Sequence, residues 1–337
     1  MIDNDTALAV LEATDRRRAE RRRFLTLATS GAATLGGLGL LSACGKSGSS
    51  SGTATPTPTP TPTATSTATA QADIDILNFA LNLEYLEAQF YLYAVYGTGL
   101  SGALTVGGGG AAAGTVTGGR QVAFTDPLVA QYAREIAQDK AAHVNFLRTA
   151  LGTAAVAMPN INIDGSATGA FTAAALAAGV VAAGGTFDPY ASDENFLLGA
   201  FIFEDVGVTA YKGATPLITS NVYLTAATGA LAAEAYHAGL IRTVLYAKGL
   251  ATPSLRTQAG QFSNWRDSLD GTSDDDQGVT GDATTSNIVP ADGNGIAYSR
   301  TTGQVLNIAY LSKAAVVGGG FFPNGVNGNI KTSTAQP

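Results

Sequence analysis

The stretch Leu231-Ala-Ala-Glu234-Ala-Tyr-His237-Ala-Gly-Leu240 holds one of only two histidines among 337 residues. Side chains three positions apart project from the same face of a helix, so Glu234 and His237 would point together into one interior. The other histidine, His143, lies in a similar alanine-rich stretch. Two scarce imidazoles in matching surroundings indicate helices that share a polar interior site.

A Glu-x6-Tyr motif precedes each histidine stretch. It runs from Glu84 to Tyr91 in the first half of the chain and from Glu204 to Tyr211 in the second. The chain therefore reads as two matching helical hairpins, and an internally duplicated, antiparallel four-helix bundle would bury their apolar faces. We expect pseudo-twofold symmetry to relate the two Glu-x6-Tyr helices to each other, and the two histidine helices likewise.

Apolar periodicity and capping signals give the bounds of these helices. They predict helices over about 75–96, 127–151, 193–212 and 222–248, with Asp73 or Asp75 capping the first and Asp126-Pro127 beginning the second. A Gly-rich connection is expected over 97–120 and a short helix over 171–183. These segments predict an all-α fold with its bundle over residues 73–250.

The composition changes after Leu250 and predicts an irregular extension over residues 251–337, packed on the bundle. Within it, Ser273 to Asp276 reads as a solvated acidic loop and Thr301 to Ser312 as a helix. Phe321-Phe322-Pro323 is expected to anchor this extension to the bundle.

The N-terminal residues read as an export signal and a tether. Arg21-Arg22-Arg23-Phe24-Leu25 resembles the twin-arginine export motif, and Leu41-Ser42-Ala43-Cys44 is similar to the lipobox of bacterial lipoproteins. The resemblance implies that residues 1–44 are a signal and that Cys44 is lipidated. Residues 45–72 are rich in Thr and Pro, which predicts a disordered tether. We therefore expect an exported protein, periplasmic or at the cell surface, whose membrane partner is reached through Cys44.

The charge balance excludes one class of partner. The chain has 19 Lys and Arg against 26 Asp and Glu, a net charge of −7, and six of the basic residues lie in the expected signal. Nucleic-acid binding needs a basic surface, so no nucleic-acid partner is expected. The tether and the long insertions argue against a closed iron-storage cage, and a smaller homo-oligomer is left open.

The spacing of acids and imidazoles is close to a known ligand set. A glutamate from each of two helices, plus Glu-x-x-His from each of two others, binds two metal ions in di-iron and di-manganese carboxylate bundles. One position breaks the pattern, because Lys140 stands three residues before His143 where a glutamate is required.

The chain resembles the ferritin-like superfamily, specifically the secreted branch that includes desiccation-related proteins. The resemblance covers most of residues 73–330 and rests on motifs in both halves and near the C-terminal end. These are Leu83 to Glu87 with Phe90-Tyr91, Ala141 to Val144, Glu204 with Tyr211, Glu234 to His237, and Gly320 to Gly325.

The resemblance implies a role for each motif residue. Glu84 and Glu204 would be terminal carboxylate ligands, Glu234 a bridging carboxylate, and His143 and His237 imidazole ligands. Tyr91 and Tyr211 would donate hydrogen bonds that orient the carboxylates. Oxygen and imidazole ligands facing one another in an apolar bundle suit iron or manganese.

Lys140 leaves three interpretations open. Asp139 could replace the lost glutamate and keep two metal ions. Alternatively, Lys140 could act as a counter-ion beside one metal ion held by Glu204, Glu234 and His237. In the third interpretation the acids are structural and no metal binds. The first two interpretations favour an iron- or manganese-dependent oxidoreductase or ferroxidase-like protein, and the third favours a non-catalytic stress-related or structural surface lipoprotein.

Overall fold

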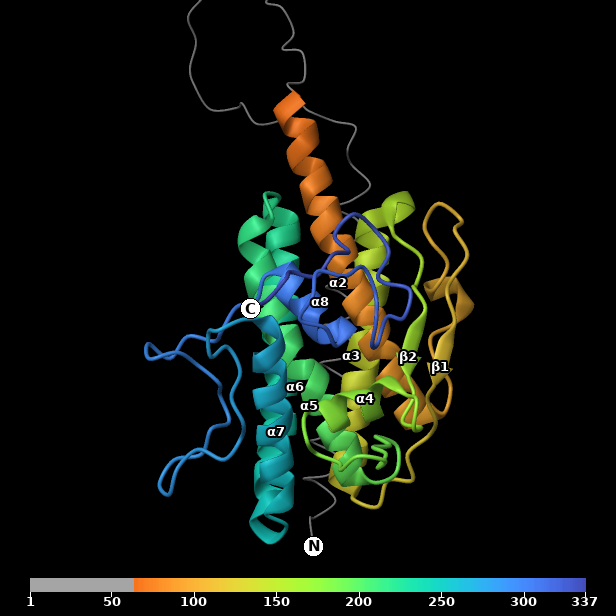
Figure 1. The fold of residues 1–337 in the computed structure, drawn as a ribbon. Coiled ribbons are helices and arrows are strands. Elements are labelled where there is room, and N and C mark those ends of the chain that lie inside the picture. Colours follow the sequence, from red (N-terminus) through yellow and green to blue (C-terminus); the bar gives the residue numbers. More distant parts are fainter. Residues whose placement is uncertain (1–63) are drawn as a thin grey trace, which may run out of the picture. The chain divides into compact units, whose positions relative to one another are not determined.

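Four long helices carry the glutamate and histidine motifs. In the computed structural model, which describes residues 64–337, these are α2 (Ala64–Tyr96), α3 (Pro127–Leu151), α5 (Asp193–Ala214) and α6 (Asn221–Ala251) (Figure 1). The predicted bounds of α3 agree with the structure, and those of α5 and α6 agree within three residues. The predicted signal, Cys44 and the first part of the tether lie outside the described residues.

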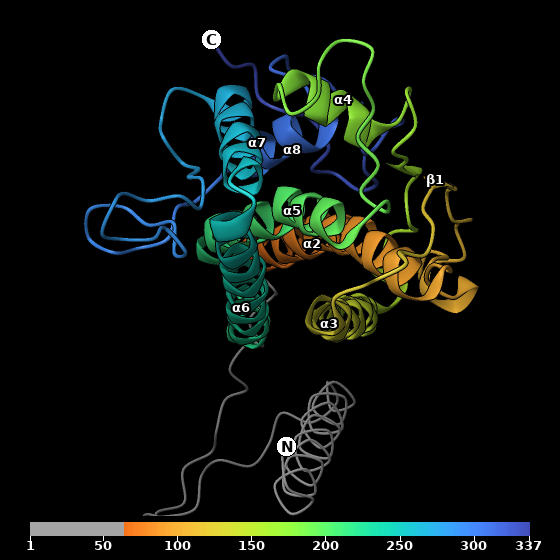
Figure 2. The same cartoon turned by 90° about the horizontal axis from the view of Figure 1, so that it is seen from below.

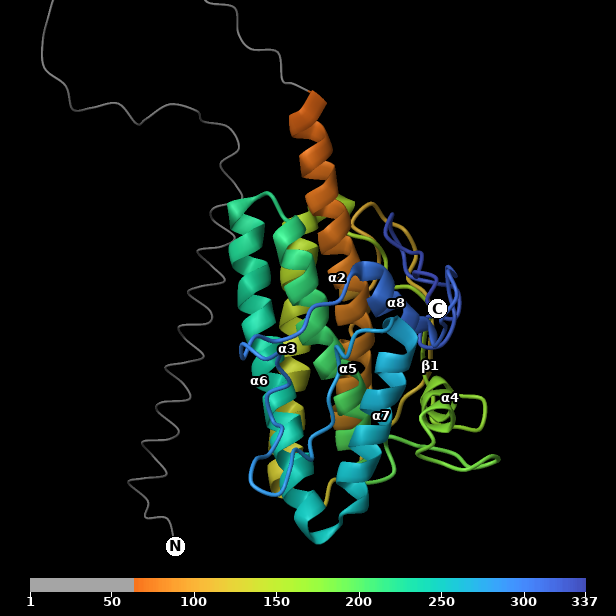
Figure 3. The ribbon, with the colours of Figure 1, turned by 60° about the vertical axis from the view of Figure 1, so that its left-hand side comes forward.

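The helices form two hairpins that pack into one bundle. Helix α2 packs along α3, and α5 packs along α6. Seen end-on, α2 and α5 form a central layer with α3 and α6 on one side of it (Figure 2). The side view shows the four helices standing roughly parallel to a common axis (Figure 3). Among residues 64–337, no helix combines the length and apolar character needed to cross a bilayer.

Helix α2 begins earlier than predicted. It starts at Ala64, so residues 64–72, which were predicted as tether, are helical. The segment after Pro62 contains no proline and is rich in alanine, and proline is the residue that would interrupt a helix there. The buried part of α2 starts at Asp73, where the predicted bundle starts.

The predicted cap of α2 was wrong, because Asp73 binds a different segment. Its carboxylate accepts hydrogen bonds from the backbone nitrogens of Thr219 and Ser220, each at 2.8 Å. Asp73 therefore fixes the turn that precedes α6. The predicted cap of α3 is confirmed, since the Asp126 carboxylate accepts from the nitrogen of Leu128 and Pro127 is the first helical residue.

Two long connections cover one flank of the bundle. Strands β1 (Val116–Gly118) and β2 (Ile161–Ile163) pair in parallel, with Val116 opposite Ile161. Helix α4 (Ala170–Ala177) follows and is shorter than the predicted 171–183, because the chain turns through Gly179 at a φ of +70°. The sequence predicted neither strand, since each has only three residues.

The C-terminal extension is more regular than predicted. It contains α7 (Ser254–Asp270) as well as α8 (Thr302–Tyr310), and only α8 was expected. Leu255, Ala259 and Phe262 recur at helical spacing in α7 and are buried. Figure 2 shows α7 and α8, with α4, on the side of the central layer opposite α3 and α6.

A buried network of arginines and aspartates joins this extension to the bundle. Asp205 of α5 lies 2.7 Å from Arg242 of α6 and 3.0 Å from Arg266 of α7. Asp276 lies 2.8 Å from Arg266 and 3.0 Å from Arg300. The acidic loop was therefore predicted wrongly at Asp276, which is buried because two arginines pair with it.

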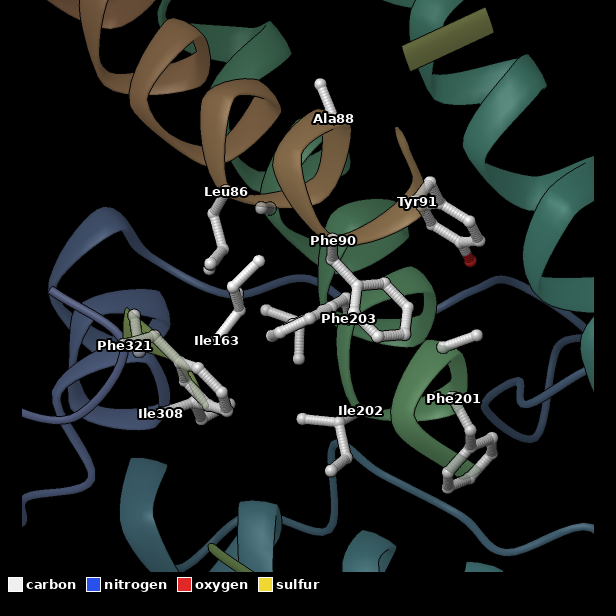
Figure 4. Packing of buried hydrophobic residues seen from close by; sticks show 14 of the residues in the cluster. Leu86, Ala88, Phe90, Tyr91, Ile163, Phe201, Ile202, Phe203, Ile308 and Phe321 are labelled. Carbon is white, nitrogen blue, oxygen red and sulfur yellow. The ribbon is translucent and has the colours of Figure 1, made fainter. Parts of the chain in front are cut away.

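The apolar core continues from the bundle into the C-terminal anchor. Phe321 packs edge-on against Phe203, with ring centroids 4.9 Å apart, and against Phe171 at 5.2 Å. Figure 4 shows Phe321 and Ile308 beside Phe203. Phe321 and Phe322 are buried, which confirms the predicted anchor.

A pair of asparagines links the first helix to the C-terminal segment. The Asn82 amide donates to the carbonyl of Asn327 at 2.8 Å, and the nitrogen of Asn327 donates to the Asn82 side chain at 3.0 Å. This reciprocal contact ties α2 to a residue 245 positions later.

Candidate metal centre

Four glutamates and two histidines meet at the middle of the bundle. Glu84 and Glu87 come from α2, Glu204 from α5 and Glu234 from α6, and all four are buried. His143 of α3 and His237 of α6 approach them, with ring centroids 6.5 Å apart. The structure therefore brings together all five residues that the sequence proposed as ligands.

Lys140 lies inside this cluster and takes part in it. Its ammonium group lies 2.5 Å from Glu87, 2.6 Å from Glu234 and 3.4 Å from Glu204, and the side chain is completely buried. Lys140 is therefore a counter-ion of the site glutamates, as the second interpretation of the sequence proposed. The ammonium group is held by α2, α5 and α6 together, so it links both hairpins at their common interior.

One half of the centre is built around Glu84. The Tyr211 hydroxyl donates to Glu84 Oε1 at 2.6 Å, and His143 Nδ1 lies 3.1 Å from the same oxygen. Since Tyr211 comes from α5, it orients a carboxylate on the other hairpin. His143 Nδ1 also lies 3.7 Å from Glu234 Oε1. Glu84, His143 and Glu234 present ligand atoms within 4.8 Å of one another, which is close enough to share a metal ion.

The other half is built around Glu204. His237 Nδ1 lies 3.4 Å from Glu204 Oε2, and His237 Nε2 lies 3.3 Å from Asp139. Glu204, Glu234 and His237 also place ligand atoms within 4.8 Å of one another, and all three are buried. Tyr91 of α2 lies near Glu204, as Tyr211 of α5 lies near Glu84, which is the expected pseudo-twofold relation.

Asp139 does not take the place of the missing glutamate. It lies on the Nε2 side of the His237 ring, whereas the Nδ1 side faces Glu204. A carboxylate behind a ligating imidazole fixes the ring orientation and strengthens the opposite nitrogen as a ligand. Asp139 is therefore a positioning residue in this structure, rather than a substitute ligand.

Two residues of the centre, Glu87 and Gly207, were not predicted from the sequence. Glu87 follows Glu84 by three residues, so the same helix face carries both, and its position in the motif could have revealed it. Gly207 of α5 leaves room for the acids, because a Cβ atom there would lie 2.4 Å from Glu234 Oε2. A glycine in the middle of a helix lowers helix stability by about 1 kcal/mol relative to alanine. Gly207 therefore makes room for the site but weakens α5.

Burial and neighbouring charges shift the pKa values in the centre. Burial favours the neutral acid and, with repulsion from Glu204 and Glu84, raises the pKa of Glu234 to about 7. Burial also raises the pKa of Glu87 well above its usual range. Glu204 behaves oppositely, because the charges of Lys140 and His237 outweigh its burial and lower its pKa to about 2.

The cationic groups are held in their charged forms. Burial opposes the charge of Lys140, but the surrounding glutamates raise its pKa well above the usual value. Burial likewise opposes protonation of His237, but the hydrogen bond to Asp139 and the nearby Glu204 carboxylate raise its pKa to about 10. The pKa of His143 is also raised, because Glu84 outweighs its burial. The centre is therefore charge-compensated by its own side chains.

Several buried ligand atoms nevertheless make no hydrogen bond of normal geometry within residues 64–337, although Lys140 and His237 Nδ1 each lie 3.4 Å from Glu204 Oε2. These atoms are both carboxylate oxygens of Glu204, His237 Nδ1 and Glu84 Oε2. Buried acceptors without a donor are costly, and a divalent cation satisfies such a group of oxygen and imidazole ligands. The residues present therefore fit a metal ion, and the fit is best at Glu204, Glu234 and His237.

Charge balance limits how many ions the centre holds. One divalent ion with two neutral imidazoles carries the same charge as two imidazolium ions. It can therefore replace the protons of His143 and His237 without changing the net charge beside Lys140. A second divalent ion would add two positive charges near a buried ammonium group, which is unfavourable in a low-dielectric interior.

Comparison with known sequences agrees with this architecture. A sequence model of the ferritin-like domain family matches residues 72–247, more than half of the chain. The chain belongs to the ferritin-like domain family. This match coincides closely with the predicted bundle over 73–250.

Two curated relatives are similar to the chain, and one of them is named a desiccation-related protein. The chain is 29% identical to the ferritin-like catalase Nec2 of Nesocodon mauritianus over 267 residues, which cover 76% of this chain and 83% of that protein. It is 33% identical to the desiccation-related protein PCC13-62 of Craterostigma plantagineum over 174 residues, 51% of this chain and 52% of that protein. The predicted fold and the family resemblance are thus confirmed.

Proposed function

We propose that this chain is an exported, lipid-anchored ferritin-like protein that binds one divalent iron or manganese ion and consumes peroxide. Support for the metal comes from the buried ligand atoms of Glu204 and His237 that make no hydrogen bond of normal geometry. The peroxide substrate is suggested by the catalase name of a relative that aligns over most of both chains. Export and anchoring rest on the sequence around Cys44.

The side chains of the centre have different roles in the proposed function. Glu204, Glu234 and His237 would hold the ion, which when bound supplies the electron transfer that peroxide chemistry requires. Asp139 keeps Nδ1 of His237 directed at Glu204. Lys140 neutralises the glutamate charge that a second ion would otherwise balance.

The test measures metal and activity together. Protein purified without chelator after growth with iron or manganese should contain about one ion per chain, the number that charge balance in the buried site favours. It should also consume hydrogen peroxide. His237→Ala should lose both metal and activity, whereas Tyr236→Ala, at an 80% exposed position on the same helix, should keep both.

A second candidate function is favoured by the ion pairs of Lys140. The ammonium group and the two imidazolium ions can balance the glutamates without any metal, which suits a non-catalytic, stress-related or structural protein. In that case metal-supplemented protein would contain no bound ion and consume no peroxide. Its metal-free form would also be as stable as the metal-supplemented form.

A further inference from the structure

A small pocket lies beside one side of the centre, among partly exposed residues of the bundle. It has a volume of about 20 Å³, and His143 and Tyr211 line it together with Tyr223, Ala227 and Ala230 of α6. The two hairpins meet here, and several lining residues are only partly buried. The pocket therefore lies between the partly exposed seam of the hairpins and the Glu84 half of the site.

His143 is the member of the six-residue cluster most open to solvent. Its side chain is 19% exposed, compared with 6% for His237 and none for Glu204 and Glu234. The Glu204 half is thus closed, and the Glu84 half has an opening at His143. Glu234 joins this opening to the proposed ion site, because it lies 3.7 Å from His143 Nδ1 and belongs to both groups of possible ligands. Another void reaches Glu87, but Val305, Ile308 and Phe321 line it, and all three are buried.

We propose, on the basis of the proposed function, that this His143 pocket is the substrate entrance and that it admits hydrogen peroxide but excludes alkyl peroxides. A volume of 20 Å³ is sufficient for about one water-sized molecule. The alanines of α6 keep the pocket open, and an alkyl group would collide with them. Among the described residues that line the pocket, the ionisable side chains are His143 and two tyrosines, and such a lining suits a small neutral substrate.

The entrance can be tested without metal or activity. The imidazole Cε1–H exchanges with deuterium at a rate that depends on solvent access, and the chain has only two histidines, so mass spectrometry of two peptides reports both. In metal-free wild type, His143 should exchange faster than His237. Ala230→Phe should slow His143 several-fold and leave His237 unchanged, whereas Ala232→Phe, on the exposed face of α6, should change neither.

Activity of the metal-loaded protein supplies the second readout. Ala230→Phe should lower kcat/KM for hydrogen peroxide with metal content unchanged, and wild type should consume hydrogen peroxide far faster than tert-butyl hydroperoxide. Should Ala230→Phe not fold, as judged by circular dichroism, Ala226→Phe fills the same pocket from the preceding turn.

The outcomes separate the entrance from the proposed function. If His143 exchanges at the wild-type rate in a folded Ala230→Phe protein, the pocket is not the entrance. The same holds if exchange at His143 is slowed but peroxide is consumed at the wild-type rate. If the protein consumes tert-butyl hydroperoxide about as fast as hydrogen peroxide, the pocket does not exclude alkyl peroxides. If His143 responds but no loaded protein consumes peroxide, the proposed function and the peroxide assignment fail, while the opening at His143 stands.

Discussion

Substitution of Lys140 by glutamate tests the central claim that an ammonium group stands in for a metal ion. The change removes the cation that lies within 3.4 Å of three buried glutamates and adds a fifth carboxylate. Removing one partner of a buried ion pair costs about 3–5 kcal/mol. At about 2–4 °C per kcal/mol for a chain of this size class, metal-free Lys140→Glu should melt about 6–20 °C below wild type.

Metal should reverse much of this loss. Lys140→Glu completes the second Glu-x-x-His motif and should raise the metal content from one ion per chain to two. A ligand at one hundred times its dissociation constant stabilises the folded state by about 2.7 kcal/mol, so added manganese should recover most of the melting temperature. Lys140→Met, which removes the charge without adding a ligand, should be destabilised but should not gain a second ion.

The assays are thermal unfolding followed by circular dichroism, with chelator and with manganese, and elemental analysis of the purified proteins. Equal melting temperatures for metal-free wild type and Lys140→Glu would show that the ion pairs contribute no stability. A metal content that does not rise would show that the lysine is not what limits the number of ions. Either result would show that Lys140 does not take the place of a metal ion.

Three further substitutions have defined expectations. Gly207→Ala should lower the melting temperature, because the new Cβ atom would lie 2.4 Å from Glu234 Oε2, which outweighs the gain of about 1 kcal/mol that alanine gives a helix. Gly229→Ala, in open space on α6, should raise the melting temperature. A shift in the same direction for both variants would contradict the crowding at Gly207. Tyr211→Phe should cost about 1.5–3 kcal/mol in urea unfolding, since it removes a 2.6 Å hydrogen bond to a carboxylate. Cys44→Ser should move the protein from the membrane to the soluble fraction with an unchanged circular dichroism spectrum, and persistence in the membrane would exclude the lipid anchor.

The bundle was predictable because its signals are local. Asp126-Pro127 and the apolar periodicity after it fixed the bounds of α3, and the repeated Glu-x6-Tyr motif identified α2 and α5 as equivalent helices. The convergence of the site followed from the same spacing, since side chains three or four positions apart share a helix face. Each of these inferences needs only neighbouring residues.

The missed features depend on contacts between distant segments. Nothing near Asp276 indicates burial, because its partners Arg266 and Arg300 are brought to it by α7 and by the return of the chain to the bundle. Gly207 reads as an unfavourable helix residue until Glu234 is placed beside it. The roles of these charged side chains and of Gly207 therefore depend on tertiary packing, which a single sequence does not show.

The reciprocal contact between Asn82 and Asn327 has a consequence for biosynthesis. Asn327 lies 245 positions after Asn82, a stretch that a ribosome makes in about 10–50 s, and during that time the part of α2 around Asn82 lacks its contact with the C-terminal segment. Completion of the fold must wait for the segment that carries Asn327, so the nascent bundle passes through a stage with an exposed apolar face. Until then, the side of the centre at Glu87 lacks the cover that Val305, Ile308 and Phe321 give it in the finished protein.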